Sequence, residues 1–177
     1  STPLYSSAAS DVYKRQTIDQ YLRFLIIDSD NTSIRKLENL MGGYLVTNER
    51  TKVELGVEYF FRDPHDVSAK DMGKVFKGIY KGEYLKSETN AYLLDLLKNT
   101  HPLLQDGIPV GVPAGTAIAH KTGQISTIPG YSWEDAAIVY GAKTDYILIF
   151  LNEKIDNDEA RSKIQKISKV VYDTLNQ

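Results

Sequence analysis

The chain has 177 residues, 42% of them hydrophobic and 25% charged, which is enough for one domain with a buried core. Its formal net charge of −2 gives no basic surface for a phosphate backbone, so we expect no nucleic-acid partner. Cysteine is absent and His65, His101 and His120 lack metal-ligand spacing, so we expect no disulfide, no metal and no cofactor.

The first 16 residues, STPLYSSAASDVYKRQ, show neither helical nor strand periodicity, whereas patterned sequence begins at Thr17. This stretch resembles a translated sequencing adaptor, and a natural disordered arm is the alternative. We therefore expect residues 1–16 to be a non-native leader and residues 17–177 to form a single domain.

Four helices are predicted in the first part of that domain. Residues 17–28 and 33–43 each carry leucine and isoleucine at helical spacing, and the short sequence DSDNT lies at their junction. Ser68 and Asp71 fit a capping box, which predicts a third helix that begins at Ser68. Residues 87–99 continue the helical spacing and predict a fourth.

The period then changes to that of strands. Residues 115–123, 135–142 and 145–153 are β-favouring runs, and the polar turn GAKTD between the last two predicts adjacent antiparallel strands. The run YILIFL is apolar throughout, so we expect cover on both of its faces. Residues 156–175 predict a helix that packs on the sheet. The fold class is therefore α/β, an antiparallel sheet packed by a C-terminal helix, plus a helical subdomain. The expected buried stripe of the C-terminal helix is Ile164, Ile167, Val171 and Leu175.

Two polar motifs stand at the ends of these elements, SDN at residues 29–31 and KTG at residues 121–123. Side chains alternate along a strand, so Lys121 should point to the face opposite His120. Gly123 would let another backbone approach the strand closely. Taken singly, SDN is typical of a helix cap and KTG of a solvated strand end.

Together and in this order, SDN and KTG resemble two of the three signature elements of penicillin-recognising serine enzymes, the class A β-lactamases and penicillin-binding proteins. The resemblance extends through SAKDMGKVFKGIYKGEYL and GIPVGVPAGTAIAHKTG to nearly everything after residue 16. It implies a serine hydrolase that acts by acyl transfer on β-lactams or D-alanyl peptides. It also implies a cell-envelope or extracellular location and a monomeric state when full length.

The resemblance assigns catalytic roles to two residues and a structural role to a third. Ser29 is similar to the hydroxyl that relays a proton to the leaving nitrogen. Lys121 is similar to the cation that attracts the substrate carboxylate and polarises Ser29. Asp30 is similar to the residue that braces the junction between the helices. A leaving nitrogen must receive a proton in this chemistry, which is why a hydroxyl and a cation are needed together.

Four further residues are implied to bind substrate. Asn31 is similar to the amide that binds the substrate's side-chain carbonyl, and Thr122 to a hydroxyl donor for the substrate carboxylate. Gly123 would allow the substrate to pair with the strand edge. Gln124 follows the KTG motif, where a backbone N–H helps to form the oxyanion hole.

The third signature element, Ser-x-x-Lys, should precede SDN in the chain. The only literal match runs from Ser33 to Lys36, after SDN, and about one such match is expected by chance in this composition. Ser33 is better explained as a first-turn residue of the second helix and Lys36 as a solvated side chain. We therefore expect the nucleophile to lie upstream of Thr17 and outside this chain, which should itself be inactive.

The carboxylate for the second half-reaction is also unassigned. Class A β-lactamases carry a glutamate in a loop after SDN that activates water. Here residues 47–66 contain Glu49, Glu54 and Glu58 without the family's Glu-x-x-Leu-Asn pattern, and each is expected to be a surface or strand carboxylate. This absence favours a β-lactamase-like hydrolase or a D-Ala-D-Ala carboxypeptidase-like relative over an efficient antibiotic-destroying enzyme.

A different class of function remains open. The rival to the enzyme is a non-catalytic sensor or binding domain for cell-wall peptides that kept the pocket and lost the nucleophile. In either case the small-molecule partner would be a β-lactam or a cell-wall peptide. Loss of leading strands and a helix should leave an exposed sheet edge and an apolar face, so we expect poor solubility.

Overall fold

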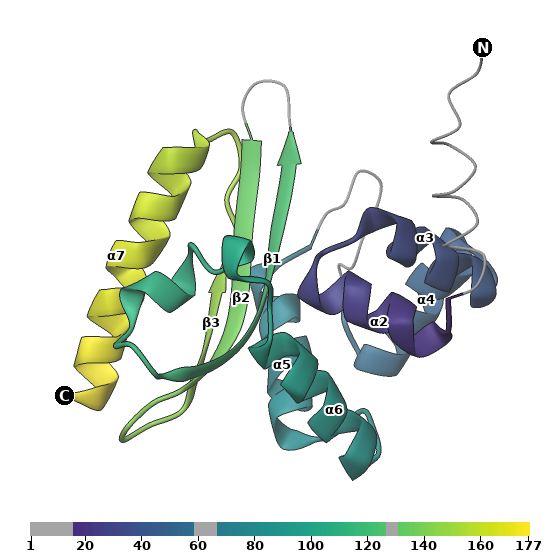
Figure 1. Cartoon of the computed structure of the whole chain (residues 1–177), viewed down its shortest axis with the longest axis horizontal. Helices are drawn as coiled ribbons and strands as arrows, with labels where there is room; N and C mark the ends of the chain where they lie inside the picture. The colour runs from purple at the N-terminus through teal and green to yellow at the C-terminus, as the bar shows by residue number, and fades with distance from the viewer. Residues whose placement is uncertain (1–15, 59–66, 127–130) are drawn as a thin grey trace.

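The computed structural model describes residues 16–58, 67–126 and 131–177. In this part of the chain, five α-helices precede a three-stranded antiparallel sheet and a sixth follows it, which confirms the predicted fold class. Figure 1 shows α7 along one face of the sheet and the earlier helices on its other side. The elements in chain order are α2 (Ile18–Ile27), α3 (Asn31–Leu40), α4 (Tyr44–Leu55), α5 (Ala69–Lys81), α6 (Ser87–Lys98), the 3₁₀ turns η1 (Pro102–Leu104) and η2 (Ile108–Gly111), β1 (Ala117–Ser126), β2 (Tyr131–Tyr140), β3 (Tyr146–Phe150) and α7 (Asn157–Asn176).

The three strands lie in the order β1-β2-β3, with β2 in the middle. Lys121 in β1 is opposite Ala136 in β2, and Ala136 is opposite Ile149 in β3. The GAKTD segment joins β2 to β3, as the sequence predicts. Within the described residues, β1 and β3 therefore each have a neighbouring strand on one side only.

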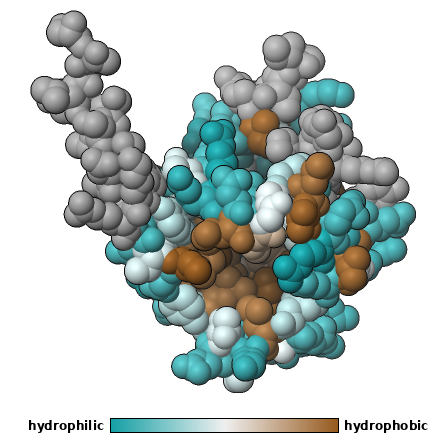
Figure 2. Space-filling view, turned by 90° about the vertical axis from the view of Figure 1, so that its right-hand side faces the viewer, coloured by the Kyte–Doolittle hydropathy of each residue, from teal (hydrophilic) through white to brown (hydrophobic). Residues whose placement is uncertain are grey.

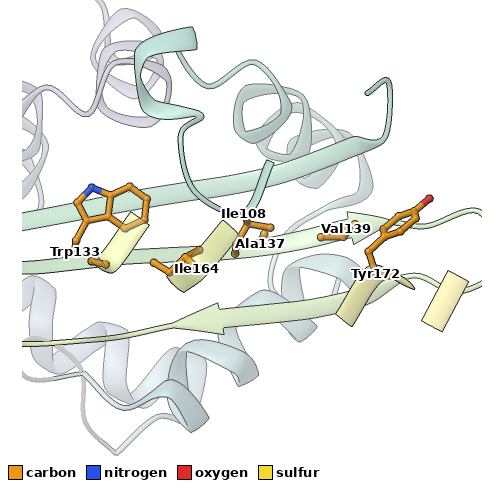
Figure 3. Packing of buried hydrophobic residues seen from close by; sticks show 7 residues of the cluster. Ile108, Trp133, Ala137, Val139, Ile164 and Tyr172 are labelled. Atoms are coloured by element: carbon orange, nitrogen blue, oxygen red, sulfur yellow. The ribbon is translucent and has the colours of Figure 1, made fainter. Parts of the chain in front are cut away.

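A hydrophobic core lies on each face of the sheet, because side chains alternate along β2. Ala137 and Val139 point toward α7, where they pack with Ile164 and Tyr172 (Figure 3). The opposite face packs against α5 and α6. Because both faces are covered, the strand that carries the KTG motif is held firmly in place. The buried side chains of the second core are Phe76, Leu97, Ala119, Ala136 and Ile138.

Strand β3 is covered on both faces, as predicted, and yet none of its residues is fully buried. Ile147 and Ile149 pack on the core beneath α5, whereas Tyr146, Leu148 and Phe150 pack on the core beneath α7. All five stay half-buried. The reason is their place at the edge of the described sheet, where only one neighbouring strand shields them.

The predicted stripe of α7 is wrong in phase. Ile164 is buried, but Ile167 is 46% exposed and Leu175 is 40% exposed, and Val171 is half-buried. Two polar residues take the buried positions because they bind backbone groups: Ser168 Oγ donates to Ile108 O at 2.9 Å, and Asn176 Oδ1 accepts from two N–H groups of the β2–β3 turn. The buried face is Ala160, Ile164, Ser168, Tyr172 and Asn176.

Helix α4 was not predicted from the sequence. It begins after Gly43, which has φ 95° and no side chain to cap the helix, and none of its residues is buried. Ion pairs at helical spacing, such as Arg50 with Glu54 at 3.0 Å, stabilise its surface. Glu49, Glu54 and Glu58 are all exposed, so they are surface carboxylates as expected. Residues 59–66 of the same segment lie outside the described residues.

Large exposed hydrophobic side chains concentrate on α2, α3 and α4. Leu45 is 75% exposed and Val53 is 81% exposed. Figure 2 views the molecule from the side of these helices and shows hydrophobic side chains gathered around a hollow. An exposed apolar surface is therefore present among the described residues, but it lies on these helices and not on the sheet, whose two faces are both covered. Others of this group are Ile18, Leu40, Met41 and Val46.

Candidate functional site

The junction between α2 and α3 presents Ser29 in an unusual conformation. Asp28 ends α2, and Ser29 follows with φ 57°, in the left-handed region that glycine favours. A serine held there costs about 1–3 kcal/mol of local strain, which the surrounding structure must offset. Asp30 N–H donates to Phe24 O at 3.1 Å, and His101 N–H donates to Ile27 O at 3.0 Å, so the junction is fixed from both sides.

Asp30 holds the start of α3. Its carboxylate accepts from Ser33 N–H at 2.7 Å and from the Ser33 hydroxyl at 2.6 Å, which is a helix cap. Ser33 is fully buried by this contact, and Lys36 is exposed. The Ser33-to-Lys36 match therefore belongs to an ordinary helix start, as expected, and its hydroxyl already has a carboxylate partner.

Lys121 connects the sheet to this junction. It points to the helical face of β1, and its Nζ donates to Ser29 Oγ, 92 residues away in the chain, and to Thr122 O at 2.8 Å. Burial of the ammonium lowers the pKa of Lys121 from its ordinary value to about 8, against a smaller opposing effect of the Asp135 charge. A polarised hydroxyl and a partly desolvated amine are thus in direct contact.

A buried pair behind the strand was not predicted from the sequence. His120 points to the α7 side, where its Nδ1 lies 3.0 Å from Asp135 Oδ1, and Asp135 Oδ2 accepts from Ile108 N–H at 2.9 Å. Asp135 is fully buried and His120 is 2% exposed. Thr100 Oγ1 donates to His120 O at 3.0 Å. An aspartate inside an apolar strand was the available signal, but its partner depends on strand register, which the sequence did not predict in detail.

Gly123 has a close neighbour on the adjacent strand. A Cβ at this position would lie 3.1 Å from Glu134 Oε2, on the strand opposite. Burial raises the pKa of Glu134 above its ordinary value. The space above Gly123 is thus restricted by a carboxylate on the same face of the sheet as Lys121.

Most of the predicted site residues line one cleft of about 410 Å³. Ser29 and Asn31 contribute from the helix junction, and Thr122, Gly123 and Gln124 contribute from β1. Lys121 reaches the cleft through its bond to Ser29, and Asp30, between the lining residues Ser29 and Asn31 in the chain, caps α3. The structure therefore brings the two motifs together. The remaining lining residues are Asp28, Leu103, Leu104, Asp106, Trp133, Asn157 and Arg161.

One ion pair at the cleft was not predicted. Arg161, in the first turns of α7, donates to Asp106 Oδ2 at 2.9 Å and also binds Asp158. These hydrogen bonds raise the pKa of Arg161. Gln165 Nε2 donates to Asp106 O at 2.7 Å, so the segment before η2 is tied to α7. The far end of the cleft thus carries one cation with two carboxylate partners.

Among the described residues, no group of three or more histidine, aspartate or glutamate side chains is placed to hold a metal ion. None of the described helices is both long enough and apolar enough to cross a bilayer. The polar groups that line the cleft are hydroxyls, amides, carboxylates, the Trp133 indole and one guanidinium, and Lys121 adds an amine through its bond to Ser29.

The model of the beta-lactamase enzyme family matches residues 7–175. No curated protein matches the chain. Among solved structures, a class A beta-lactamase from Bacteroides cellulosilyticus DSM 14838 superposes with a TM-score of 0.79 at 23% identity, over 95% of this chain and 68% of that chain. A beta-lactamase from Chitinophaga pinensis DSM 2588 gives 0.77 at 23% identity, over 89% and 64%.

PBP-A gives a TM-score of 0.76 at 22% identity, over 90% of this chain and 61% of that chain, and a variant of PBP-A has been solved as an acyl-enzyme complex with penicillin-G. At these identities the likeness shows a shared fold. The chain spans 61–65% of the length of the first three structures that it matches.

Proposed function

The chain belongs to the beta-lactamase enzyme family, and on that premise we propose that it is the C-terminal portion of a serine hydrolase that acts by acyl transfer on β-lactams or D-alanyl peptides. One observation carries the proposal: the hydrogen bond from Lys121 to Ser29, which joins the two motifs across one cleft. A cation and a polarised hydroxyl at the same point suit the delivery of a proton to a leaving nitrogen.

Each predicted site residue has a role in this proposal. Lys121 attracts the substrate carboxylate, and the Thr122 hydroxyl donates a hydrogen bond to it. The Asn31 amide binds the carbonyl of the substrate's side chain, and Ser29 relays the proton. The Gln124 N–H contributes to the oxyanion hole, while Gly123 leaves the strand edge open to substrate. Asp30 acts indirectly, because it fixes the start of the helix that carries Asn31.

The acyl-accepting serine of the working enzyme would come from a Ser-x-x-Lys segment that is not in this sequence. The fraction of the matched structures that the chain spans supports this part of the proposal. The parent protein would work in the cell envelope or outside the cell as a monomer. The chain by itself would bind substrate without turning it over, so steady nitrocefin hydrolysis by the purified chain would contradict the proposal.

A D-alanyl-peptide substrate, as for a D-Ala-D-Ala carboxypeptidase, is the second candidate. It is favoured because Glu49, Glu54 and Glu58 are exposed surface carboxylates and none of them lines the cleft. A non-catalytic sensor of cell-wall peptides would use the same cleft. Sequencing the source DNA across the junction of Gln16 and Thr17 separates enzyme from sensor: an upstream Ser-x-x-Lys supports the enzyme, and another residue in place of that serine supports the sensor.

Binding to the cleft can be tested on the chain as it stands. NMR titration with benzylpenicillin at about pH 6.5, where Lys121 is charged, should perturb the signals of Asn31 and Thr122. Replacing Thr122 with valine should weaken this non-covalent binding several-fold because a hydrogen bond to a carboxylate is lost. Thr174→Val, at an exposed position of α7, is the matched control. Equal affinities of wild type and Thr122→Val would count against the assigned role.

A further inference from the structure

We propose that Ser29 and Lys121 form a nucleophile and base pair of their own, so that this chain becomes acylated on Ser29 by one equivalent of a strained or activated acyl compound such as a β-lactam. The inference goes beyond the proposed function, in which Ser29 only relays a proton. It needs no upstream serine, because both reacting groups are in the described residues.

The first support is geometric. Lys121 Nζ is in direct hydrogen-bond contact with Ser29 Oγ, and a second bond of 2.8 Å to Thr122 O fixes the direction of the amine. Ser29 also lines the cleft of about 410 Å³, so an acyl compound can reach its hydroxyl. A serine hydroxyl beside a positioned amine is the arrangement that activates a weak oxygen nucleophile.

The second support is a comparison with the other serines. Ser33 Oγ donates to the Asp30 carboxylate, and Ser168 Oγ donates to a backbone carbonyl. Ser68 Oγ donates to the Asp71 carboxylate at 2.9 Å. Of the serines whose side chains are described, Ser29 alone is bonded to a lysine amine. It is also the one held at positive φ, at a sharp turn between two helices, which is where strained reactive residues occur.

The charges around Lys121 allow it to act as a base. Asp135 lies on the other face of the sheet, Glu134 lies on the neighbouring strand, and Asp28 and Asp30 flank Ser29 in the chain. No salt bridge joins Lys121 to a carboxylate of the described residues. Burial places its pKa at about 8, so roughly half of the amines are neutral at that pH and can accept a proton.

The step balances without another reagent. Ser29 Oγ forms a bond to the lactam carbonyl carbon while neutral Lys121 Nζ takes the hydroxyl proton. The lactam C–N bond then breaks, and the proton passes from Nζ to the departing nitrogen. The product is an ester on Ser29 whose mass is the sum of protein and β-lactam. The edge of β1 has outward N–H groups without a ladder partner in the described sheet, and Gln124 at this edge lines the same cleft, so donors are available for the oxyanion.

The test is intact-mass spectrometry of the purified 177-residue chain after incubation with benzylpenicillin between about pH 6.5 and about pH 9.5. We expect one adduct, formed faster as the pH rises through about 8. Trypsin should place the adduct in the peptide of residues 24–35, and tandem mass spectrometry should assign it to Ser29 rather than Ser33. Ser29→Ala should abolish the adduct, whereas Ser87→Ala, at the exposed start of α6, should not change its rate.

Lys121→Arg separates this inference from the proposed function. Arginine keeps the positive charge that attracts a carboxylate but cannot accept a proton in this pH range, so acylation should fall more than about tenfold. Circular dichroism should show that each variant is folded. The inference is overturned if no adduct forms across the pH range, if the adduct is on another residue, or if Lys121→Arg acylates at the wild-type rate. None of these results bears on the binding of substrate in the cleft.

Discussion

Replacing Asp135 with asparagine would test how the buried pair behind β1 supports the cleft. The carboxylate accepts from Ile108 N–H at 2.9 Å and lies 3.0 Å from His120 Nδ1. Asparagine keeps the shape of the side chain but has one acceptor oxygen where aspartate has two. If that oxygen stays with Ile108, an NH₂ group faces His120, and the imidazole proton must move from Nδ1 to Nε2. Nε2 is buried and has no hydrogen-bond partner among the described residues.

The hydrogen bonds that change determine the expected loss of stability. Nε2 lacks a partner in the described part of the wild-type chain as well, so what changes is that a hydrogen bond to a carboxylate, worth about 1.5–3 kcal/mol, becomes one to a neutral amide, worth about 0.5–1.5 kcal/mol. Asp135→Asn should therefore lower the free energy of unfolding by about 1 kcal/mol. Asp135→Ala should cost more, about 2–6 kcal/mol, because both partners lose their acceptor. Urea denaturation with a fitted midpoint and slope measures both changes. Asp145→Asn is the matched control: this exposed residue accepts from Tyr80 Oη at 2.8 Å, a bond that asparagine can keep, and the change should stay within about 0.5 kcal/mol.

Asp135→Asn should also change the titration of Lys121 at the cleft. The Asp135 charge raises the pKa of Lys121 against the larger effect of burial, so its removal should move the pKa of Lys121 below about 8. A carbon-13 NMR titration of the lysine Cε signal measures this shift. An unfolding midpoint equal to that of wild type, together with an unchanged Lys121 titration, would refute the reasoning.

Three other outcomes are expected. Below about pH 8, Lys121 is protonated in both the folded and the unfolded protein. Between about pH 8 and about pH 10.5, the unfolded chain keeps a proton that the folded chain has released. The free energy of unfolding of wild type, relative to that of Lys121→Met, should therefore rise with pH in this range. Urea midpoints of the two proteins across this range check the sign, and a flat difference would contradict it. Ile164→Ala should lower the free energy of unfolding by about 2–5 kcal/mol and Ile167→Ala by less than about 1 kcal/mol, because only Ile164 is buried. Equal losses in urea denaturation would instead support the buried stripe expected from the sequence. The double variant Leu45→Lys, Val53→Lys should be more soluble than wild type because it removes exposed apolar surface. If light scattering shows that the wild type is a monodisperse monomer at high concentration, this surface does not cause aggregation.

The elements with strong local signals were predicted well from the sequence. α2 begins at a Thr17 cap with a reciprocal Gln20 bond, and α5 begins at the predicted Ser68 cap, because capping depends on residues three apart. The strand pairing of β2 and β3 followed from a short polar turn. The cleft was also foreseen in part, since the two motifs meet there although 92 residues separate Ser29 from Lys121. That expectation came from the family resemblance, because no local pattern specifies a contact over such a distance.

The features that were missed depend on tertiary contacts. α4 has no buried residue and no side-chain cap, so its sequence lacked the amphipathic pattern on which a prediction rests. The buried face of α7 includes Ser168 and Asn176, and hydrophobicity alone cannot predict polar residues that are buried to bind distant backbone groups. The Asp135 pair and the Arg161 ion pair at the cleft likewise require the register of the strands and the position of α7 to be known. The leader of residues 1–16 and the single-domain division remain predictions.

The contact made by Asn176 has a consequence for the motion of a turn that lies far away in the sequence. Its Oδ1 accepts from Lys143 N–H at 2.8 Å and from Thr144 N–H at 2.9 Å, and it fills the space beside Gly141. Replacing Asn176 with alanine would remove this acceptor and leave the turn between β2 and β3 without its support. Loss of this one side chain would therefore be detected as faster amide exchange more than thirty positions earlier in the sequence, at the base of an edge strand.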